Sequence, residues 1–463
     1  MNYIDLFAGA GGLSEGFHNA GFTPVAHVEM DAYACDTIRT RLAWYHLKSK
    51  KNHQPYFDYL RKRLSREELY KLIPPEVLDS VINEAIGEDT RDGIFARIDR
   101  QLERLPEGQR AVDLIVGGPP CQTFSVAGRA RLGSAVMEKD PRSKLYLQYA
   151  KFLSRYRPKM FVFENVLGML SFKNGEQLNL IRETFLEAGY VMDVREWNAR
   201  DFGVLQSRER LIIIGWRIDQ PALGYPVFKT LTPDEQNEHL VAELLDDLPA
   251  LAPGQRLPDA TAYTKLQTPY IKKTGLRRDC PVITWHETRP HREEDREIYR
   301  LFIEHWNDGG DQYQRMRYDE LPEHLIFHEN KKEFTDRFKV VARDMTYSQT
   351  VVAHISKDGH YYIHPDVNQL RSLSVREAAR LQSFPDNFYF EGPRTSVLKQ
   401  IGNAVPPLMG TRIAESVRDA LNGNGDFLPP DSPIGKRRSG KVEKQLAKAA
   451  KKQVHADGQS VLT

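Results

Sequence analysis

Short apolar segments that alternate with helical stretches constrain the fold of this chain more than any other feature of its sequence. Five such segments are rich in Val, Ile and Phe and almost continuous in apolar character: residues 3–7, 24–29, 112–116, 160–165 and 211–216. Strands covered on both faces have this composition, so we expect a mostly parallel sheet. Helical patterns lie between them, for example at residues 144–156 and 176–189. The sequence therefore predicts a doubly wound α/β domain, in which ligands bind at the carboxyl ends of the strands.

The chain is long enough for more than one domain. A chain of 463 residues is too long to fold around one compact core, so two domains and a tail are expected. The alternation fills residues 1–216, interrupted at about 41–110 by a charged segment that we interpret as a helical insertion. Its charges are typical of a solvated face, with contact to a nucleic-acid backbone as the weaker alternative.

The alternation of strands and helices stops after residue 216. For residues 217–392 we expect a smaller domain of irregular and β structure. Within it, Ser374 and Glu377 have the spacing of a capping box, which predicts the start of a helix that ends at Pro385.

The C-terminal part differs from the rest in charge. Residues 393–425 include an amphipathic helical pattern at 408–421 and are expected to return to the first domain. Residues 426–463 are basic and are predicted to be disordered. The chain has a formal net charge of +2, yet its last 30 residues hold eight Lys and Arg against two acids. The remainder is therefore negative, and a polyanionic partner would have to meet local basic patches.

Membrane proteins and disulfide-framework proteins are excluded as classes. No run of about 18 apolar residues occurs, and the N-terminus, "MNYIDLFAGAGG", leads into a predicted strand without a basic leader, so no signal peptide is expected. The three cysteines, Cys35, Cys121 and Cys280, are far apart and lack metal-ligand spacing. This usage indicates a reduced compartment, so we expect a cytoplasmic protein without a metal site.

A glycine-rich turn follows the first predicted strand in "DLFAGAGG". Gly9, Gly11 and Gly12 allow a tight turn and close approach of a ligand. Ser14 stands where a dinucleotide fingerprint needs its third glycine, which favours a nucleoside cofactor without pyrophosphate. Glu29 closes the second strand, where an acid suits the hydroxyls of a ribose. The alternative is a plain strand–turn–helix with an exposed acid.

Three further stretches lie at the ends of predicted strands: "GGPPCQTFS" (117–125), "ENV" (164–166) and "QSRER" (206–210). Taken alone, each stretch could also have a purely structural role instead of a catalytic one. Cys121 could be a buried small hydrophobe, Glu164 a helix cap, and the two arginines an exposed strand edge. Because the carboxyl ends of neighbouring parallel strands meet, their joint occurrence favours one composite site.

These stretches, in this order, resemble the cytosine-C5 DNA methyltransferase family. "DLFAGAGGLSEGF" is similar to its cofactor motif, "GGPPCQTFS" to its nucleophile motif, and "ENV", "QSRERL", "REAARLQSFPDNF" and "QIGNAVPP" to the motifs that follow. Methyltransferases that alkylate an exocyclic amine carry an acid or amide before Pro-Pro, whereas Gly118 stands there. The resemblance implies a Rossmann-like catalytic domain at 1–216, a target-recognition domain at 217–392, and S-adenosylmethionine as methyl donor, without a metal.

The resemblance also implies the roles of the catalytic residues. The thiolate of Cys121 would add to carbon 6 of cytosine and make carbon 5 nucleophilic, which splits one difficult step into two easier ones. Glu164, protonated or sharing a proton, would hydrogen-bond to ring nitrogen 3 and the exocyclic amine. Arg210 would hold the ring carbonyl oxygen, and Arg208 would support Glu164 or a phosphate.

For the cofactor, the family implies that Phe7 stacks on adenine, Glu29 holds the ribose and the glycine turn faces the methionine end. The remaining candidates at this site are Asp5, Met30, Asp89, Pro119 and Asn403. Met30 stands where many relatives carry an aromatic residue. Asp89, in "GEDTRDG", is the candidate for an acid near the adenine.

The duplex DNA partner implied by the family must present its cytosine outside the helix, because an enzyme cannot reach it in the stack. Residues 122–140 are expected to form a loop that closes on the DNA, with Gln122 and Ser125 as contacts. Side chains between about 217 and 370 would read base edges or hold phosphates. The candidates are Arg289, His291, Arg292, Arg337 and Arg343. The basic tail would add salt-sensitive, nonspecific affinity.

The expected function is therefore methylation of a specific DNA sequence, in a restriction-modification system or in protection of host DNA. A monomer acting on DNA in a prokaryotic cytoplasm, associated with the nucleoid, is expected, with a cognate restriction endonuclease as a functional partner. The alternatives are a tRNA cytosine-C5 methyltransferase on the same scaffold, a noncatalytic DNA-binding protein, and a thiol hydrolase. The last would need a histidine paired with Cys121, and the stretches at 117–125, 164–166 and 206–210 contain none.

Overall fold

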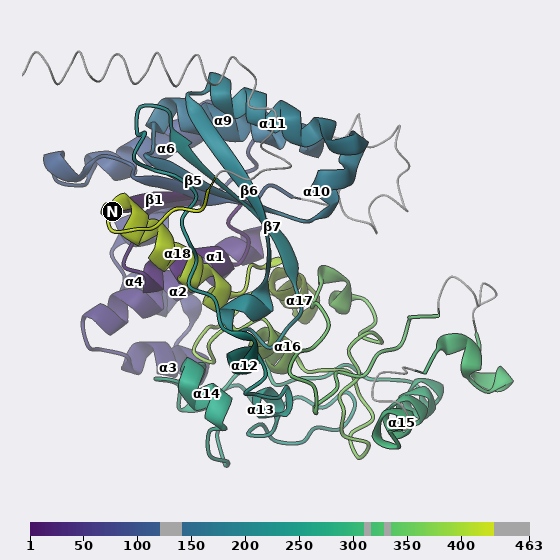
Figure 1. Ribbon diagram of the computed structural model, residues 1–463. Coiled ribbons are helices and arrows are strands. Elements are labelled where there is room, and N and C mark those ends of the chain that lie inside the picture. Colours follow the sequence, from purple (N-terminus) through teal and green to yellow (C-terminus); the bar gives the residue numbers. More distant parts are fainter. Residues whose placement is uncertain (121–140, 310–315, 328–334, 430–463) are drawn as a thin grey trace, which may run out of the picture.

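A seven-stranded sheet forms the centre of the N-terminal half (Figure 1). The computed structural model describes residues 1–120, 141–309, 316–327 and 335–429. The strands are β1 (Asn2–Leu6), β2 (Thr23–Glu29), β3 (Val81–Asn83), β4 (Leu114–Gly117), β5 (Met160–Asn165), β6 (Tyr190–Asn198) and β7 (Glu209–Arg217). Their order is β3-β2-β1-β4-β5-β7-β6, and only β7 runs antiparallel to its neighbours. The predicted doubly wound, mostly parallel α/β fold is confirmed.

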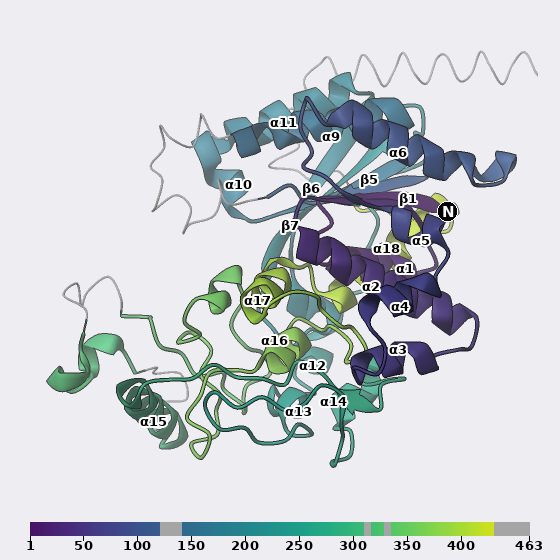
Figure 2. The same cartoon turned by 180° about the vertical axis from the view of Figure 1, so that it is seen from behind.

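Helices cover both faces of this sheet, which explains why its strands are apolar throughout (Figures 1 and 2). On one face lie α6 (Arg91–Glu103), α9 (Leu145–Tyr156) and α11 (Glu176–Glu187); on the other lie α1 (Gly12–Asn19) and α18 (Pro407–Leu421). Phe161 and Phe163 of β5 pack with the first group, whereas Val162 packs with the second. The C-terminal helix α18 thus completes the core that the first residues of the chain begin.

All five predicted strands are present, but two more were not expected. Strand β3 and helix α6 lie inside the range interpreted as a helical insertion, so that range includes part of the sheet domain. Strand β6 is the edge of the sheet and pairs only with β7. Neither strand was predicted, because its hydrophobic pattern is weak. Strand β3 has only three residues, and β6 has charged side chains among its apolar ones.

The segment between β2 and β3 is helical. It consists of α2 (Ala32–Ser49), α3 (Gln54–Leu60), α4 (Arg66–Lys71) and α5 (Pro75–Asp79). Helix α4 starts at a complete capping box between Ser65 and Glu68. In both ribbon views α3 lies beside α14 (Pro269–Thr274) of the C-terminal half, so this segment packs between the two halves.

The C-terminal half is built from short elements joined by irregular chain. Its helices and strands are α12 (Pro233–Gln236), α13 (Ala242–Leu245), β8 (Thr261–Ala262), α14 (Pro269–Thr274), β9 (Val282–Ile283), α15 (Glu293–Asn307), α16 (Val375–Leu381) and α17 (Arg394–Asn403). The predicted capping box of Ser374 and Glu377 is confirmed at the start of α16. The helix ends at Leu381, earlier than predicted, because Ser383 adopts a positive φ of 58°.

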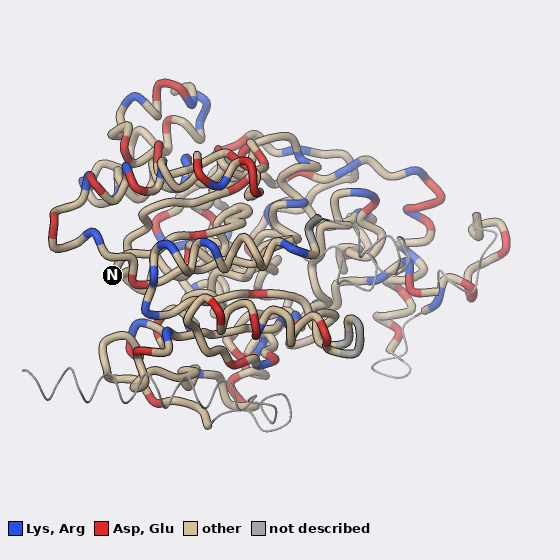
Figure 3. Tube along the Cα trace, turned by 90° about the horizontal axis from the view of Figure 1, so that it is seen from above, with Lys and Arg blue, Asp and Glu red and all other residues tan. Residues whose placement is uncertain are grey.

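The remaining short elements are α10 (Gly168–Ser171) and the 3-10 turns η1 (Glu107–Gln109), η2 (Pro141–Lys144), η3 (Phe172–Gly175), η4 (Ala199–Phe202), η5 (Tyr318–Glu320), η6 (Glu323–Leu325) and η7 (Ala353–Ser356). None of the helices in the described ranges is long and apolar enough to span a membrane. Lys and Arg are interleaved with Asp and Glu along the described trace (Figure 3).

Candidate active site

The candidate site lies between two neighbouring strands whose following connections run to opposite sides of the sheet. The chain leaves β1 toward β2 on one side and leaves β4 toward β5 on the other, although β1 and β4 are neighbours. Their carboxyl ends meet at Leu6 and Gly117, which are paired in the register. Open α/β sheets bind ligands in the crevice outside such a switch point.

Two glycines let the loop after β4 leave the sheet in close contact with its neighbours. Gly117 has a φ of +146°, and a Cβ atom there would lie 2.0 Å from the carbonyl oxygen of Leu6. A Cβ atom on Gly118 would lie 2.8 Å from Oε2 of Glu164. The loop backbone therefore lies directly against the Glu164 carboxylate, and Pro119 is buried beside it. Cys121, Gln122 and Ser125 lie outside the described residues, as does the rest of 121–140.

Glu164 and Arg210 form an ion pair at this edge. Nε of Arg210 lies 2.8 Å from Oε1 of Glu164, and the two side chains are 13% and 15% exposed. Strands β5 and β7 are antiparallel and pair Glu164 with Ile212, which brings the end of one strand to the start of the other. The guanidinium is also fixed by a hydrogen bond from its Nη1 to the carbonyl of Glu209. A partly buried, oriented carboxylate–guanidinium pair is suited to binding a flat polar ring.

Arg208 is placed differently from the prediction. Its side chain is fully buried, and its guanidinium donates to the carbonyl oxygens of Val351 (2.7 Å) and Gly402 (3.3 Å). In this position the guanidinium is buried among backbone carbonyls and is not exposed to a DNA phosphate. These bonds join the segment before β7 to the C-terminal half.

Glu29 is oriented by backbone donors at the second strand end. Gly9 N donates to its Oε2 and Asp31 N to its Oε1, both at 2.8 Å. Burial raises the pKa of this carboxyl, although the backbone hydrogen bonds oppose that rise. Each carboxylate oxygen can accept a further hydrogen bond, so the group can still bind vicinal hydroxyls. Phe7, with a positive φ of 58°, holds its partly buried ring at the same edge.

The three glycines of the turn serve two purposes. Gly9 and Gly11 have positive φ, which the turn requires. Gly12 does not have this conformation; instead, a Cβ atom there would lie 2.4 Å from the carbonyl oxygen of Val405. Its small size thus admits the "QIGNAVPP" segment, a role that the sequence did not reveal. Asn403, in that segment, is exposed at the end of α17.

The other cofactor candidates differ in position. Asp5 is buried within the sheet, where burial raises its pKa to about 8. Met30 is 67% exposed directly after Glu29. Asp89 lies in an exposed turn six residues beyond β3, whereas Asn83 ends that strand and its Nδ2 donates to the carbonyl of Met30 at 2.9 Å. The position of Asn83 could not be foreseen, because its strand was not predicted.

A large cavity opens beside this site in the C-terminal half. It has a volume of about 890 Å³, and Ser207, next to "RER", forms part of its wall. Its wall also includes Trp306, Arg337, Tyr347, Gln349 and His354. Of the five predicted DNA-contacting side chains, Arg337 alone lines this cavity.

The other four candidates are positioned elsewhere. Arg289 donates to the backbone carbonyls of Ile355 and Ser356. Arg343 forms an ion pair with Asp246. His291 hydrogen-bonds to Ser372 and Tyr299, and Arg292 lies 5.6 Å over the ring of Phe327. Within the described ranges, no group of three or more His, Cys, Asp or Glu could hold a metal ion.

Comparison with known proteins places these features in a family context. The family model described as "C-5 cytosine-specific DNA methylase" matches residues 1–55 and 90–419. Type II methyltransferase M.Bpa9945I of Bacillus paralicheniformis is 42% identical over 453 residues, covering 92% of this chain and 100% of that protein. Type II methyltransferase M.DdeI of Desulfomicrobium norvegicum is 28% identical over 441 residues, covering 90% and 88%.

The fold also has a solved counterpart. A prophage-encoded E. coli protein, described as a DNA modification methyltransferase, superimposes with a TM-score of 0.56 at 23% identity. The match covers 91% of this chain and 99% of that protein. At this identity the likeness concerns the fold.

Proposed function

The chain belongs to the C-5 cytosine-specific DNA methylase family and is a DNA cytosine-5 methyltransferase, and from this premise we propose how its site works. It transfers a methyl group from S-adenosylmethionine to carbon 5 of a cytosine that has been flipped out of a specific duplex sequence. The names of its relatives favour a role in a restriction-modification system. The Glu164–Arg210 pair against the backbone of Gly118 is the observation that carries the proposal.

The reaction assigns one task to each group at the strand ends. The Cys121 thiolate would form a bond to carbon 6, and the electron pair displaced from the 5,6 double bond would make carbon 5 nucleophilic. Carbon 5 would then take the methyl group that S-adenosylmethionine supplies, and the electron pair of the broken carbon–sulfur bond would stay on the donor's sulfur. Glu164 hydrogen-bonds to nitrogen 3 and the amino group, while Arg210 binds the carbonyl oxygen, so that charge entering the ring is stabilised. Loss of the carbon-5 proton to water then returns the electron pair and expels the sulfur.

The residues at the ends of β1 and β2 fit S-adenosylmethionine, which supplies an electrophilic methyl group when bound. Glu29 presents a carboxylate already oriented by two backbone donors, suited to the ribose hydroxyls. Phe7 offers a ring for the adenine, and Gly9 and Gly11 leave the turn open at the methionine end. We propose that Asp5 supports this turn from within the sheet.

Replacing Glu29 with alanine is expected to weaken S-adenosylhomocysteine binding by about tenfold or more, because hydrogen bonds to a charged group are lost. Titration calorimetry measures this affinity, and duplex DNA binding in the same variant is expected to change less than twofold. In the unsubstituted protein, affinity is expected to fall with decreasing pH once Glu29 is protonated. Its raised pKa moves that loss to a higher pH than an ordinary glutamate would show. Equal losses of cofactor and DNA affinity would contradict the ribose role.

We propose that the cavity beside Ser207 receives the base edges of the target sequence. Arg337 is its free donor, since its Nε has no hydrogen-bond partner within the described residues. Gln349 uses its Nε2 on the carbonyl of Tyr361, which leaves its Oε1 as an acceptor for a base. An arginine and an amide acceptor in an aromatic-lined cavity can discriminate bases by their edges.

Arg337→Ala is expected to relax sequence preference by about tenfold at one base pair, the effect of losing a specific base contact. Methylating a plasmid of mixed sequence and sequencing the modified cytosines measures this preference and also reveals the recognition site. Arg292→Ala is the matched control, because this arginine lies against Phe327 and not in the cavity. If the preference stays unchanged in Arg337→Ala, or shifts equally in both variants, the assignment is wrong.

A further inference from the structure

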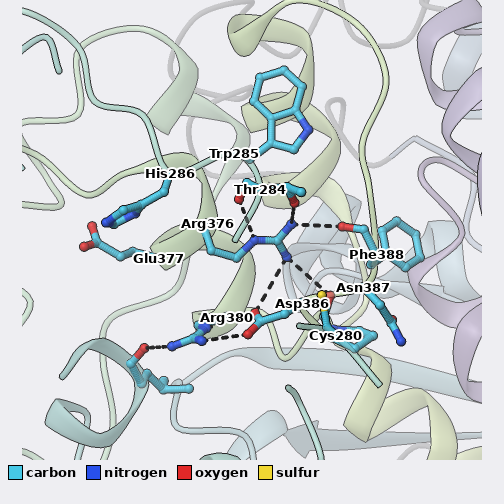
Figure 4. Close-up of polar contacts among 12 residues, drawn as sticks. Cys280, Thr284, Trp285, His286, Arg376, Glu377, Arg380, Asp386, Asn387 and Phe388 are labelled. Carbon is cyan, nitrogen blue, oxygen red and sulfur yellow. Dashed lines mark hydrogen bonds and ion pairs between the residues drawn. The ribbon is translucent and has the colours of Figure 1, made fainter. Parts of the chain in front are cut away.

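One short segment of chain, residues 386–391, joins the two halves of the molecule. From the C-terminal half it is held by two buried arginines of α16 (Figure 4). Nε of Arg380 donates to the carboxylate of Asp386 at 2.9 Å. Arg376 donates to the carbonyl oxygens of Phe388 (3.1 Å) and Thr284 (3.0 Å). This face of the segment is therefore fixed to the half that contains the proposed base-reading cavity.

The opposite face of the segment is held by α3 and by Lys62 after it, whose Nζ donates to the hydroxyl of Tyr389 at 2.8 Å. The hydroxyl of Tyr56 donates to the carbonyl of Asn387 at 2.7 Å, and that of Tyr59 donates to Oε1 of Glu391 at 2.6 Å. Both tyrosines are buried in the core cluster that includes Phe384, Phe388 and Phe390. The charged segment at 41–110, whose charges were interpreted as a solvated face, thus also contributes aromatic side chains to the core.

Helix α2 connects this junction to the cofactor end of the sheet. It begins three residues after Glu29, whose Oε1 accepts from Asp31 N. On its inner face Thr40 donates to Oε1 of Glu391 at 2.6 Å, and Arg41 bridges Glu15 of α1 and Asn387. The two cofactor-side helices and the C-terminal half therefore meet at residues 387 and 391.

The junction depends on the individual hydrogen bonds that Glu391 accepts. Its carboxyl is buried, and burial raises its pKa, while the hydrogen bonds from Thr40 and Tyr59 oppose that rise. A buried carboxylate that loses one of its donors is costly to keep in place. The Tyr59 hydroxyl is thus well placed to control how firmly the segment is held.

Residues 56–89 lie outside the match to the family model, although the chain on both sides matches it. We infer that residues 54–72 are a brace, which fixes the orientation of the recognition half relative to the cofactor half and so supports DNA binding. This inference rests on the proposed function. It assigns Tyr59 as a positioning residue, acting through Glu391 and touching neither cofactor nor DNA.

The test removes one hydroxyl and keeps the ring. Tyr59→Phe is expected to raise KM for duplex DNA carrying the recognition site by about three- to tenfold. The kcat and the Kd for S-adenosylhomocysteine are expected to stay within about twofold, because the groups at the strand ends are unchanged. Tyr190→Phe is the matched control: its buried hydroxyl donates to the carbonyl of Pro158, within the sheet domain. This control is expected to lower thermal stability while leaving KM unchanged.

Fluorescence anisotropy gives the DNA Kd without turnover, so the brace and the proposed reaction are tested separately. A wild-type protein that binds DNA but transfers no methyl group would overturn the proposed reaction, and the Kd values would still decide the brace. Unchanged DNA affinity in Tyr59→Phe, or an equal change in Tyr190→Phe, would overturn the inference. Tyr56→Phe supplies a second variant with the same expected direction, should Tyr59→Phe not fold.

Discussion

Replacing Cys121 with serine is expected to abolish methyl transfer, with a loss on the order of 10⁴-fold or more, as when other enzymes lose their nucleophile. A thiolate is accessible near neutral pH and is a soft nucleophile, whereas a serine hydroxyl ionises far less readily. The backbone at Gly117 and Gly118 is fixed by Leu6 and Glu164, so the substitution should not move the loop origin. The Kd for S-adenosylhomocysteine is therefore expected to stay within about twofold.

Duplex DNA with 5-fluorocytosine at the target position isolates the covalent step. Fluorine cannot leave carbon 5 as a cation, so the sulfur cannot be expelled after methylation, and a protein–DNA adduct should survive denaturation. Wild type is expected to form this adduct and Cys121→Ser to form none. Cys280→Ser is the control, because that buried thiol contacts the carbonyl of Val282 away from the strand ends. Retained turnover in Cys121→Ser would remove the nucleophile assignment.

The sequence predicted the sheet wherever hydrophobic burial dominates. Strands β4 and β5 are covered by helices on both faces, so their composition alone identifies them. Edge strand β6 instead carries Asp193, Arg195 and Glu196, which weaken its hydrophobic pattern. The same reasoning about strand ends predicted that the segments after β4 and β5 lie side by side. Arg210 was assigned to this site through the family resemblance, and it reaches Glu164 because β7 runs antiparallel to β5.

Contacts between distant parts of the chain could not be predicted. Arg208 lies just before β7, in a stretch whose backbone hydrogen-bonds to residue 348. The alternation of side chains along a strand therefore does not determine where its side chain points. Tyr59 lies among charged residues and looked solvated, yet its partner Glu391 is 332 residues away. Gly12 looked like part of a ligand-binding turn, but its neighbour is Val405. In each case tertiary packing, which local pattern does not encode, sets the role.

The Glu164–Arg210 pair is expected to behave as one catalytic unit. Glu164→Gln is expected to reduce the single-turnover rate by about 10²- to 10⁴-fold, since the amide cannot supply the proton to nitrogen 3. Arg210→Ala is expected to cost about 10²- to 10³-fold, the effect of losing a group that stabilises developing charge. Glu209→Gln, whose exposed side chain precedes the arginine, serves as the control and is expected to stay near the wild-type rate.

The double variant decides whether the two groups cooperate. Their side chains are in direct contact at 2.8 Å, so each orients the other, and losing one already disables much of what its partner contributes. Glu164→Gln with Arg210→Ala is therefore expected to be less than about tenfold slower than the worse single variant. Rates measured at saturating DNA and cofactor remove differences in binding. A double variant whose loss equals the product of the two single losses would mean that the groups act independently, and the charge-stabilising pair at the strand ends would have to be abandoned.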